Sequence, residues 1–474
     1  MIFNTFPILG NLATTNDLSW IDGPQLREMI NARVAQLTGN IGPNDRILIC
    51  HGGTAGFVAD LLAVWSTGAA AACINSSATD HEKQTLIKFV EPVAVLEQHL
   101  QAPLFIDKNR SKKNGQSLSL DHPALYLFTS GTTGNPKGVE HSFRSLLARF
   151  TLNQAYMKLP KSIKTLCPLP THFGHGLIGN LLTPLLSGRD VILLDDKSPM
   201  GLAKLGEIID ANEIGFLSSV PSFWKMATRL SKPPVSGSLK RVHVGSAPLS
   251  TELWEAIANW CGTDQVFNMY GITETANWIG GTSLAEGRKA DGRIGEVWGG
   301  SAMVLDPETG ERSLTGSGEL LVQTPSLMNG YFKQPELTDA VLKDGWFHTG
   351  DIGTIEEDGD IRITGRQKSE INRAGMKILP EEIDLLLERH EDIQEVCVFG
   401  LPDAISGERV AVACVLKDGV EPNLEILHNW LQGLIRREAI PESWFILDEI
   451  PKTDRGKINR DNVRKKCLEI GEFK

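Results

Sequence analysis

The chain has 474 residues, of which 41% are hydrophobic and 22% charged, as expected for a globular protein of two or three domains. Its formal net charge of −11 excludes a general nucleic-acid or anionic-membrane binder with a basic face. The N-terminus lacks the basic start of a signal peptide, and the longest apolar stretch, residues 61–74, is too short and interrupted to cross a bilayer. We therefore expect a cytoplasmic protein without membrane insertion.

The first 75 residues alternate between helix and strand patterns. Helices are expected at 25–37 and 58–66, and short buried strands at 46–50 and 69–74. Such alternation predicts a parallel sheet covered on both faces. The pattern returns further along the chain in strands at 190–194, 214–217 and 239–244.

After about residue 300 the pattern changes. Short strands at 316–322 and 359–364 with Gly and Asp turns indicate a β-rich part. From residue 371 a small α+β unit follows, and the polar, glycine-led junction 365–369 is a candidate hinge. The unit has expected helices at 380–390 and 424–437 and expected strands at 396–399 and 410–416.

A buried strand at 125–128 opens into a loop of hydroxyl residues and glycines that ends at Lys137-Gly138, before a helical pattern that begins at Ser142. Glycines let backbone N–H groups approach a phosphate chain, hydroxyls add donors, and lysine supplies the countercharge. The loop is not a Walker P-loop, because Pro136 occupies the place of its second glycine. An ordinary surface turn is the alternative. We predict a site for a nucleoside triphosphate.

Seven cysteines are scattered without a C-x-x-C pair, and the 11 histidines show no metal-ligand spacing. We expect reduced thiols rather than zinc ligands or a disulfide framework. Four further stretches are harder to explain as structure alone. They are Asn268-Met269-Tyr270-Gly271-Ile272-Thr273-Glu274-Thr275, the segment 345–353 around Asp351, Gly365-Arg366, and the segment 451–460 around Lys457.

Together with the loop, these motifs resemble the adenylate-forming superfamily, which includes acyl-CoA synthetases, adenylation domains of nonribosomal peptide synthetases and firefly luciferases. The resemblance runs from about Trp20 to Arg460. It implies an α/β fold with a large N-terminal domain of α/β sheets at residues 1–366, including a β-rich subdomain at about 290–366. A hinge at 367–368 would join it to a small mobile α+β C-terminal domain at 369–474.

The resemblance also implies roles for the motif residues. The triphosphate would be held by Thr129, Ser130, Gly131, Thr132, Thr133, Gly134 and Lys137. The nucleoside part of ATP would be bound by the residues Gly245, Ser246, Ala247, Asn268, Tyr270, Gly271, Asp351 and Arg366. Tyr270 would stack on adenine and Asn268 would bond its amino edge, while Asp351, an acceptor only, would take both ribose hydroxyls.

Three residues are the expected catalytic group. Thr273 would contact the α-phosphate, Glu274 would carry Mg²⁺, and Lys457 would stabilise charge as a carboxylate attacks the α-phosphate. Lys368 matches the hinge position of the family. One departure is that Phe143 stands where many members have histidine, and His141 lies two residues too early to replace it.

The expected acyl pocket contains His172, Phe173, His175, Ser219, Phe223 and Trp278. No carboxylate lies between Thr171 and Leu186 to pair an amine, which argues against an α-amino acid. The aromatic residues favour a small or aryl acid over a long fatty acid.

We therefore expect a ligase that uses ATP to convert a small carboxylic acid into acyl-AMP, releases pyrophosphate and transfers the acyl group to a thiol, with coenzyme A as the expected acceptor. One alternative is a stand-alone adenylation enzyme that loads an acyl or aminoacyl group onto a phosphopantetheinyl carrier protein in trans, and another is an amide-forming ligase. A catalytically inactive nucleotide-binding protein would be expected to lack Lys137, Glu274, Asp351 or Lys457, and all four are present.

Overall fold

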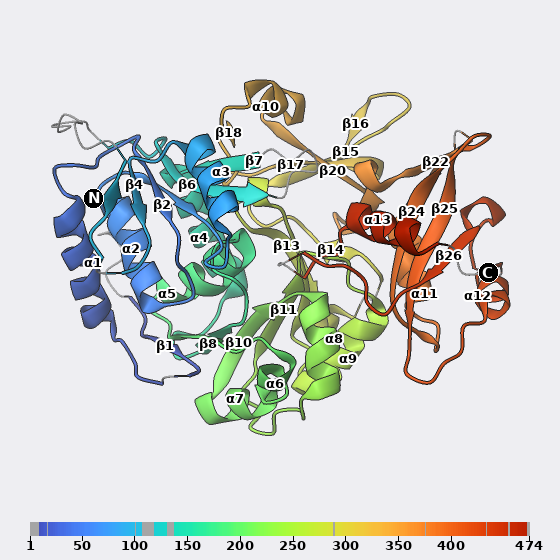
Figure 1. Ribbon diagram of the computed structural model, residues 1–474, viewed down its shortest axis with the longest axis horizontal. Coiled ribbons are helices and arrows are strands. Elements are labelled where there is room, and N and C mark those ends of the chain that lie inside the picture. Colours follow the sequence, from blue (N-terminus) through green and yellow to red (C-terminus); the bar gives the residue numbers. More distant parts are fainter. Residues whose placement is uncertain are drawn as a thin grey trace.

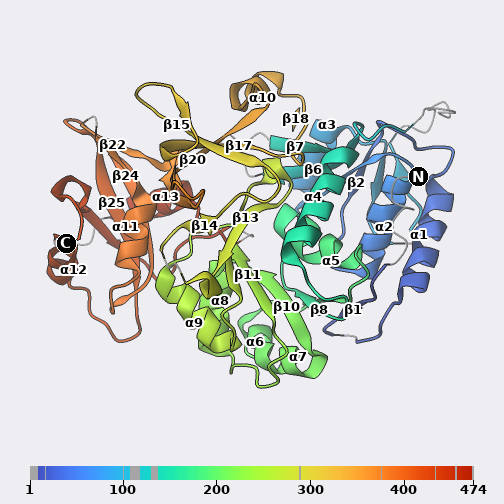
Figure 2. The same cartoon turned by 180° about the vertical axis from the view of Figure 1, so that it is seen from behind.

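A computed structural model describes residues 9–16, 18–99, 101–106, 118–129, 137–287, 290–374, 376–432, 434–453 and 456–471. Three sheets form the larger part of the molecule, and a fourth sheet belongs to a smaller part at the C-terminal end (Figure 1). The reverse view shows the same separation, with the first and last segments at opposite ends (Figure 2). Within the described residues, no helix has the length and apolar character needed to cross a membrane.

The first sheet has the strand order β18-β7-β6-β3-β2-β4-β5. Its centre is parallel, whereas β5, β7 and β18 are antiparallel to their neighbours. The strands are β2 (Arg46–Ile49), β3 (Ala70–Cys73), β4 (Ala94–Leu96), β5 (Leu104–Phe105), β6 (Pro123–Thr129), β7 (Lys137–Ser142) and β18 (Gly330–Tyr331). The helices of this region are α1 (Gly23–Leu37), α2 (Ala55–Ser66), α3 (Asp80–Val90) and α4 (Phe143–Met157).

Local sequence explains where these helices begin. The Asp22 side chain accepts a hydrogen bond from the Gln25 amide at the start of α1, and Thr54 caps α2 in the same way. Ser142 ends β7 and caps α4, so a single residue marks the change from strand to helix. The apolar helix α2 is buried from Gly56 to Trp65, because an element that is apolar on every face must be covered on every face.

The second sheet has the order β1-β9-β8-β10-β11-β12-β13 and is parallel except for β13. Its strands are β1 (Leu12–Thr14), β8 (Lys164–Cys167), β9 (Val191–Leu193), β10 (Ile214–Ser219), β11 (Arg241–Gly245), β12 (Val266–Gly271) and β13 (Trp278–Ser283). The accompanying helices are η2, a π-helix (His175–Leu182), α5 (Thr183–Leu185), α6 (Pro199–Leu202), α7 (Leu205–Asn212), α8 (Pro221–Leu230) and α9 (Thr251–Cys261). The carboxyl ends of β10, β11 and β12 lie at one edge, where side chains that follow these strands meet.

The third sheet is antiparallel and has the order β14-β21-β20-β17-β15-β16, with β19 paired to β20. Its strands are β14 (Arg293–Gly295), β15 (Ser301–Leu305), β16 (Arg312–Ser313), β17 (Gly316–Gln323), β19 (Leu342–Lys343), β20 (Trp346–Ile355) and β21 (Ile361–Arg366). Helix α10 (Pro335–Val341) lies beside it. Four short 3₁₀ turns complete the described helices: η3 (Thr273–Thr275), η4 (Leu284–Glu286), η5 (Gln367–Ser369) and η6 (Arg437–Ala439).

The C-terminal part contains a mixed sheet of order β23-β22-β25-β24, with β26 parallel to β25. Its strands are β22 (Ile371–Arg373), β23 (Met376–Ile378), β24 (Ile393–Asp403), β25 (Gly407–Leu416) and β26 (Ser443–Ile446). Its helices are α11 (Pro380–Leu387), α12 (Leu424–Gln432) and α13 (Arg460–Ile470). Two apolar clusters line the faces of this sheet, apart from the clusters of the larger part.

The expected α/β fold with a β-rich sheet and a small α+β C-terminal part is confirmed. Three details differ from the sequence expectations. The loop after β6 returns as strand β7, which the alternation of helix and strand did not predict, so the first sheet is mixed rather than parallel. Helix α11 ends at Leu387 instead of 390, and α12 ends at Gln432 instead of 437. Glu140 and His141 made β7 look like a loop, but Tyr126 and Thr273 satisfy their side chains.

Candidate active site

Strands β6 and β7 form the hairpin that carries the predicted phosphate loop. Thr129 pairs with Lys137 across the open end of this hairpin. The predicted residues Ser130, Gly131, Thr132, Thr133 and Gly134, and the side chain of Thr129, lie outside the described residues. The hairpin nevertheless places Lys137 at a defined point, because its register fixes the first residue after the loop.

Lys137 lies against Tyr331 and Glu274. Its ammonium nitrogen is 3.8 Å from the centre of the Tyr331 ring and 3.4 Å from Glu274 Oε1. Burial lowers the pKa of Lys137, the Glu274 carboxylate opposes this shift, and the charges of Lys368 and Arg366 add to it. Three cationic side chains therefore lie near one carboxylate, an arrangement suited to a polyanion.

The turn Thr273–Thr275 is held from both sides. The Tyr331 hydroxyl donates to Glu274 Oε1 at 2.7 Å, and His141 Nε2 donates to the Thr273 carbonyl at 2.8 Å. Burial lowers the pKa of His141 to about 4, so the neutral ring acts as a fixed donor near neutral pH. Phe143, by contrast, is the first residue of α4 and packs in the apolar core.

Arg149 supports the segment that follows the turn. This guanidinium of α4 is buried and donates to the Trp278 carbonyl at 2.5 Å and to the Ser326 hydroxyl. Ser326 donates in turn to the Thr275 carbonyl at 3.0 Å. Burial lowers the pKa of Arg149 to about 9. One buried cation thus positions both ends of the segment between Thr275 and Trp278.

Asp351 is the centre of a compact charged group. It is 2% exposed, accepts a hydrogen bond from the Tyr270 hydroxyl at 2.5 Å and forms an ion pair with Arg366 at 2.6 Å. Antiparallel pairing of β20 with β21 sets Asp351 opposite Arg366. Burial, followed by the Asp351 charge, raises the pKa of Tyr270. A carboxylate offers about four acceptor positions, so Asp351 retains capacity for further donors such as hydroxyl groups.

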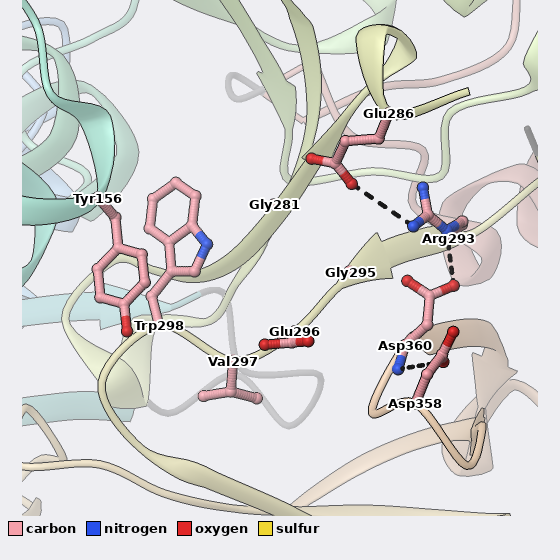
Figure 3. A pocket seen from close by; sticks show the side chains of 10 residues that line it. All are labelled: Tyr156, Gly281, Glu286, Arg293, Gly295, Glu296, Val297, Trp298, Asp358 and Asp360. Carbon is pink, nitrogen blue, oxygen red and sulfur yellow. Dashed lines mark hydrogen bonds and ion pairs between the residues drawn. The ribbon is translucent and has the colours of Figure 1, made fainter. Parts of the chain in front are cut away.

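Asn268 lies on β12 with its amide nitrogen 2.7 Å from the Arg293 carbonyl. The carbonyl oxygen of its side chain is the acceptor that an adenine amino group needs. Arg293 itself lines a separate cavity of about 270 Å³. Figure 3 shows this arginine between Glu286 and Asp360, with the stacked rings of Tyr156 and Trp298 at the other side. None of the predicted site residues lines this cavity.

The turn after β11 carries Gly245, Ser246 and Ala247. Ser246 has a φ of 70°, a left-handed conformation that costs energy for a residue with a Cβ and is often found at functional sites. Gly245 approaches closely, because a Cβ there would lie 2.9 Å from the Met269 carbonyl oxygen. Gly271 likewise meets the Asn277 backbone. The turn therefore presents its Ser246 hydroxyl in a fixed direction.

Ser246 meets His175, the first residue of the π-helix η2. His175 Nδ1 is 2.8 Å from Ser246 Oγ, and His175 Nε2 is 2.7 Å from Ser218 Oγ. The imidazole also makes an edge contact with Trp278, with ring centres 5.4 Å apart. Burial, and then the nearby charge of Lys457, lowers the pKa of His175 to about 3. The ring is therefore neutral and clamped between two hydroxyls.

The remaining expected pocket residues divide between two faces of the sheet. Phe216 and Ser218 of β10 face His175 and His243, whereas Leu217 packs with the cluster under α8 and α9. Because strand side chains alternate, Ser219 points toward that second cluster. Phe223 also packs there, while His172 and Phe173 stay half-buried with ring centres 3.9 Å apart. Trp278 lies under His175, so the structure brings Ser218 and Trp278, but not Ser219, to this histidine.

Lys457 belongs to the C-terminal part, and its loop lies at the carboxyl end of β10. Its neighbour Gly456 packs on α8, where an added Cβ would lie 2.6 Å from Ser222 Oγ. In Figure 1 the red segment before α13 extends from the C-terminal sheet toward the middle of the molecule. The loop is anchored at both ends, by Lys452 on Glu395 and by Arg460 on Asp384 at 2.7 Å. These contacts carry the lysine loop to the carboxyl end of β10.

Ion pairs connect the two parts around this loop. Lys225 of α8 lies 2.6 Å from Glu388, and Arg229 lies 2.9 Å from Asp418. Arg389 contacts both Glu252, at 3.1 Å, and Asp291. Lys368, the predicted hinge residue, is exposed in η5 between β21 and β22.

Two residues of the site were absent from the sequence predictions: Tyr331, and His141 as a hydrogen-bond donor. Tyr331 lies on a two-residue strand that pairs with β7, so its approach to Glu274 depends on a long-range pairing. His141 had been weighed only as a replacement for Phe143. The alternation of β10 could have separated Ser218 from Ser219, because Leu217 and Phe216 face different cores.

Comparisons with known proteins agree with this geometry. The AMP-binding enzyme family matches residues 10–332, and the AMP-binding enzyme C-terminal domain matches 382–457. A probable CoA ligase CCL9 from Humulus lupulus is 30% identical over 94% of this chain and 91% of its own length. An oxalate–CoA ligase from Arabidopsis thaliana is 28% identical over 94% and 93%. The ATP-bound RpMatB-BxBclM chimera B3 has a TM-score of 0.85 at 25% identity, covering 99% of both chains. The chain therefore belongs to the AMP-binding, adenylate-forming enzyme family, among the AMP-forming acid–CoA ligases.

Proposed function

We propose that this protein joins a small carboxylic acid to coenzyme A through an acyl-adenylate. In the first step a carboxylate oxygen attacks the α-phosphorus of ATP, and pyrophosphate leaves. In the second step the thiol sulfur attacks the acyl carbon, AMP leaves with the carboxylate oxygen, and the thiol proton goes to solvent. One observation carries this proposal. Lys457, from the C-terminal part, lies near the strand ends where His175 is bonded to Ser246.

Lys457 has the central role in the first step. The carboxylate and the α-phosphate are both anions, so their approach is opposed by repulsion that a cation between them offsets. Charge stabilisation of this kind is effective in a site from which water is excluded. Thr273 would donate its hydroxyl to the α-phosphate, from a turn that His141 and Tyr331 keep in place.

Glu274 fits a magnesium ion that accompanies ATP. The hydrogen bond from Tyr331 and the ion pair with Lys137 both use Oε1, which leaves Oε2 for a cation. Mg²⁺ commonly takes one or two carboxylates and completes its shell with phosphates and water. Among the described residues no group of three His, Cys, Asp or Glu side chains could hold a metal by itself, as expected for an ion held mainly by substrate. When bound, the ion would neutralise charge on the phosphates.

The nucleotide would bind along the edge between Lys137 and Arg366. Lys137 and the loop 129–134 would hold the triphosphate, Tyr270 and the Gly245–Ala247 turn would flank the adenine, and Asp351 would accept the ribose hydroxyls. Arg366 and Tyr270 already donate to Asp351, so the carboxylate is oriented before substrate arrives.

Coenzyme A is the proposed acceptor because relatives that span nearly the whole chain are named CoA ligases. The second step needs the acyl carbon open to a thiol, so Lys457 must leave the acid. We propose that the part after residue 368 rotates about Lys368 to allow this, with a boundary between an adenylation core at 1–366 and a C-terminal domain at 369–474.

The test is product identification with MgATP, a panel of short aliphatic, hydroxy and aryl acids, and coenzyme A. Mass spectrometry is expected to find the acyl-CoA together with AMP. A carrier protein bearing phosphopantetheine, and simple amines, are tested in parallel as acceptors. Acyl transfer to either of these at rates above that to coenzyme A would replace the proposed acceptor, and the absence of any adenylate would overturn the function.

A further inference from the structure

We infer that the acid site takes a short monocarboxylic acid whose tail carries no charge, and that His175, clamped by Ser218 and Ser246, is its specificity-determining residue. This inference rests on the proposed function, because it concerns the acid whose carboxylate meets Lys457. It concerns a property that the motifs do not specify: whether the far end of the acid is neutral, anionic or cationic.

The position of His175 relative to the reaction follows from three contacts. The loop of Lys457 packs through Gly456 on Ser222, three residues after the end of β10. His175 bonds Ser218 on that same strand end, and Ser246 on the neighbouring strand end. An acid whose carboxylate lies at Lys457 therefore extends its tail past the imidazole.

Burial and the nearby charge of Lys457 lower the pKa of His175, which favours the neutral imidazole. Both ring nitrogens are bonded to hydroxyls at 2.8 and 2.7 Å. A hydroxyl can act as donor or acceptor, so the neutral ring, with one donor and one acceptor nitrogen, is fully satisfied. The positive charge of Lys457 nearby opposes a second cation. The tail therefore meets a neutral hydrogen-bonding surface.

Arg241 is a further cation behind this surface; its Nη2 has no hydrogen-bond partner among the described residues, but this atom is shielded from solvent. His243 lies behind His175, and Arg241 donates to His243 Nε2 at 2.8 Å. Arg241 is also stacked 3.6 Å from the centre of the Phe267 ring and bonded to the Met157 carbonyl, which keeps it on the far side of His243. Among the described residues, no carboxylate is bonded to His175, Ser218 or Ser246. A second carboxylate or an ammonium on the acid would therefore be desolvated without a partner.

Trp278 limits the length of the tail. Its indole lies directly on η2 at Gly179, where an added Cβ would meet the ring at 2.7 Å. The tryptophan is 3% exposed and packs with Phe216, Phe267 and Trp298 in one apolar cluster. The space between the π-helix and β13 is thus filled with protein, and a long chain has no path beneath His175.

The test compares acids that have the same shape and differ only in charge. Malonate is paired with malonamate, and oxalate with oxamate, beside propionate, isobutyrate and β-alanine. Acid-dependent pyrophosphate release gives kcat/KM, and inhibition of the best substrate ranks acids that do not react. We expect each neutral acid to exceed its charged counterpart about 100-fold, the effect of an unpaired buried charge.

Two variants connect this preference to His175. His175→Arg places a cation at the clamp and is expected to raise the malonate-to-malonamate ratio of kcat/KM about 100-fold. His175→Gln, which retains a neutral hydrogen-bonding group, is expected to keep the wild-type ratio. The wild-type comparison remains decisive if His175→Arg does not fold.

The possible outcomes test this inference and the proposed function separately. A wild-type enzyme that activates malonate or oxalate better than its neutral counterpart overturns this inference and leaves the proposed function intact. Equal ratios in wild type and in a folded His175→Arg variant overturn the role of His175. No pyrophosphate release with any acid overturns the proposed function, and this inference with it.

Discussion

The nucleotide side and the acid side of this site use different chemistry. On the nucleotide side, Asp351 is bonded to Arg366 and Tyr270, and Glu274 lies beside Lys137. On the acid side, His175 is bonded to two serine hydroxyls and packs on Trp278. Charged side chains therefore line the proposed nucleotide side, whereas a neutral hydrogen-bonding ring lies at the proposed acid side.

The difference explains why one half of the site could be read from sequence and the other could not. The residues of the nucleotide side lie in short continuous motifs, which the sequence alone shows to resemble the adenylate-forming family. The acid differs between enzymes, and its surface is built from side chains on separate strand ends. A substitution that changes only the nucleotide side or only the acid side supports this division. A substitution that changes both sides contradicts it.

The largest effect is expected for Lys457→Ala. Loss of the cation at the attacking carboxylate should lower pyrophosphate formation about 100- to 1,000-fold. Thioester formation from a supplied acyl-adenylate should largely survive, because that step does not need this charge. The two half-reactions are measured separately on the same preparation.

Lys465→Ala is the matched control, since Lys465 is an exposed lysine of α13 in the same C-terminal part. It should leave both steps near wild type. Equal loss of both steps in Lys457→Ala would contradict a role confined to adenylation.

A smaller effect is expected for Tyr331→Phe. This change removes the hydroxyl that donates to Glu274 and keeps the ring beneath Lys137. The concentration of Mg²⁺ that gives half-maximal adenylation should rise about 5- to 10-fold, the effect of one hydrogen bond to a charged group. Tyr126→Phe, which loses a similar bond to Glu140, is the control. An unchanged magnesium requirement in Tyr331→Phe would argue against Glu274 as the ligand.

Breaking an ion pair between the larger part and the C-terminal part should lower adenylation still less. Lys225→Glu and Glu388→Lys each break the ion pair beside the lysine loop, and adenylation should fall about 2- to 5-fold in each. The double charge swap should restore it. The more exposed pair Arg229–Asp418 is the comparison. Failure of the double variant to recover activity would mean that this ion pair does not position Lys457.

The last effect concerns stability rather than activity. Burial lowers the pKa of His141 to about 4 and of His175 to about 3, whereas histidine in an unfolded chain titrates near pH 6.5. The unfolded state therefore binds more protons between these values, and the free energy of unfolding falls as the pH falls. The slope should approach about 1.4 kcal/mol per pH unit for each such histidine.

Urea unfolding at pH 7, 6 and 5 checks this slope. His141→Gln should reduce the dependence on pH by the share of one histidine, and substitution of the exposed His81 should not. Identical slopes in wild type and His141→Gln would contradict a buried neutral His141.

The sequence predicted some residues of the site and missed others. Asp351, Arg366, Glu274 and Lys137 were predicted as parts of one site, and they lie together. Tyr331 was not predicted, because it approaches Glu274 only through the pairing of β18 with β7. Strand β7 itself was missed, since its charged residues hide their partners from a local pattern. Ser219 was chosen for the acid pocket where strand alternation favours Ser218, and its role in acid binding stays a prediction.

The central claim is that this chain makes acyl-adenylates. The most direct measurement is acid-dependent release of pyrophosphate from MgATP, with and without coenzyme A, across short aliphatic, hydroxy, aryl and dicarboxylic acids. We predict pyrophosphate and AMP as products, one class of short uncharged acids as substrates, and a higher turnover when coenzyme A is present. Release of orthophosphate and ADP, or ATP hydrolysis that no acid stimulates, would contradict the account.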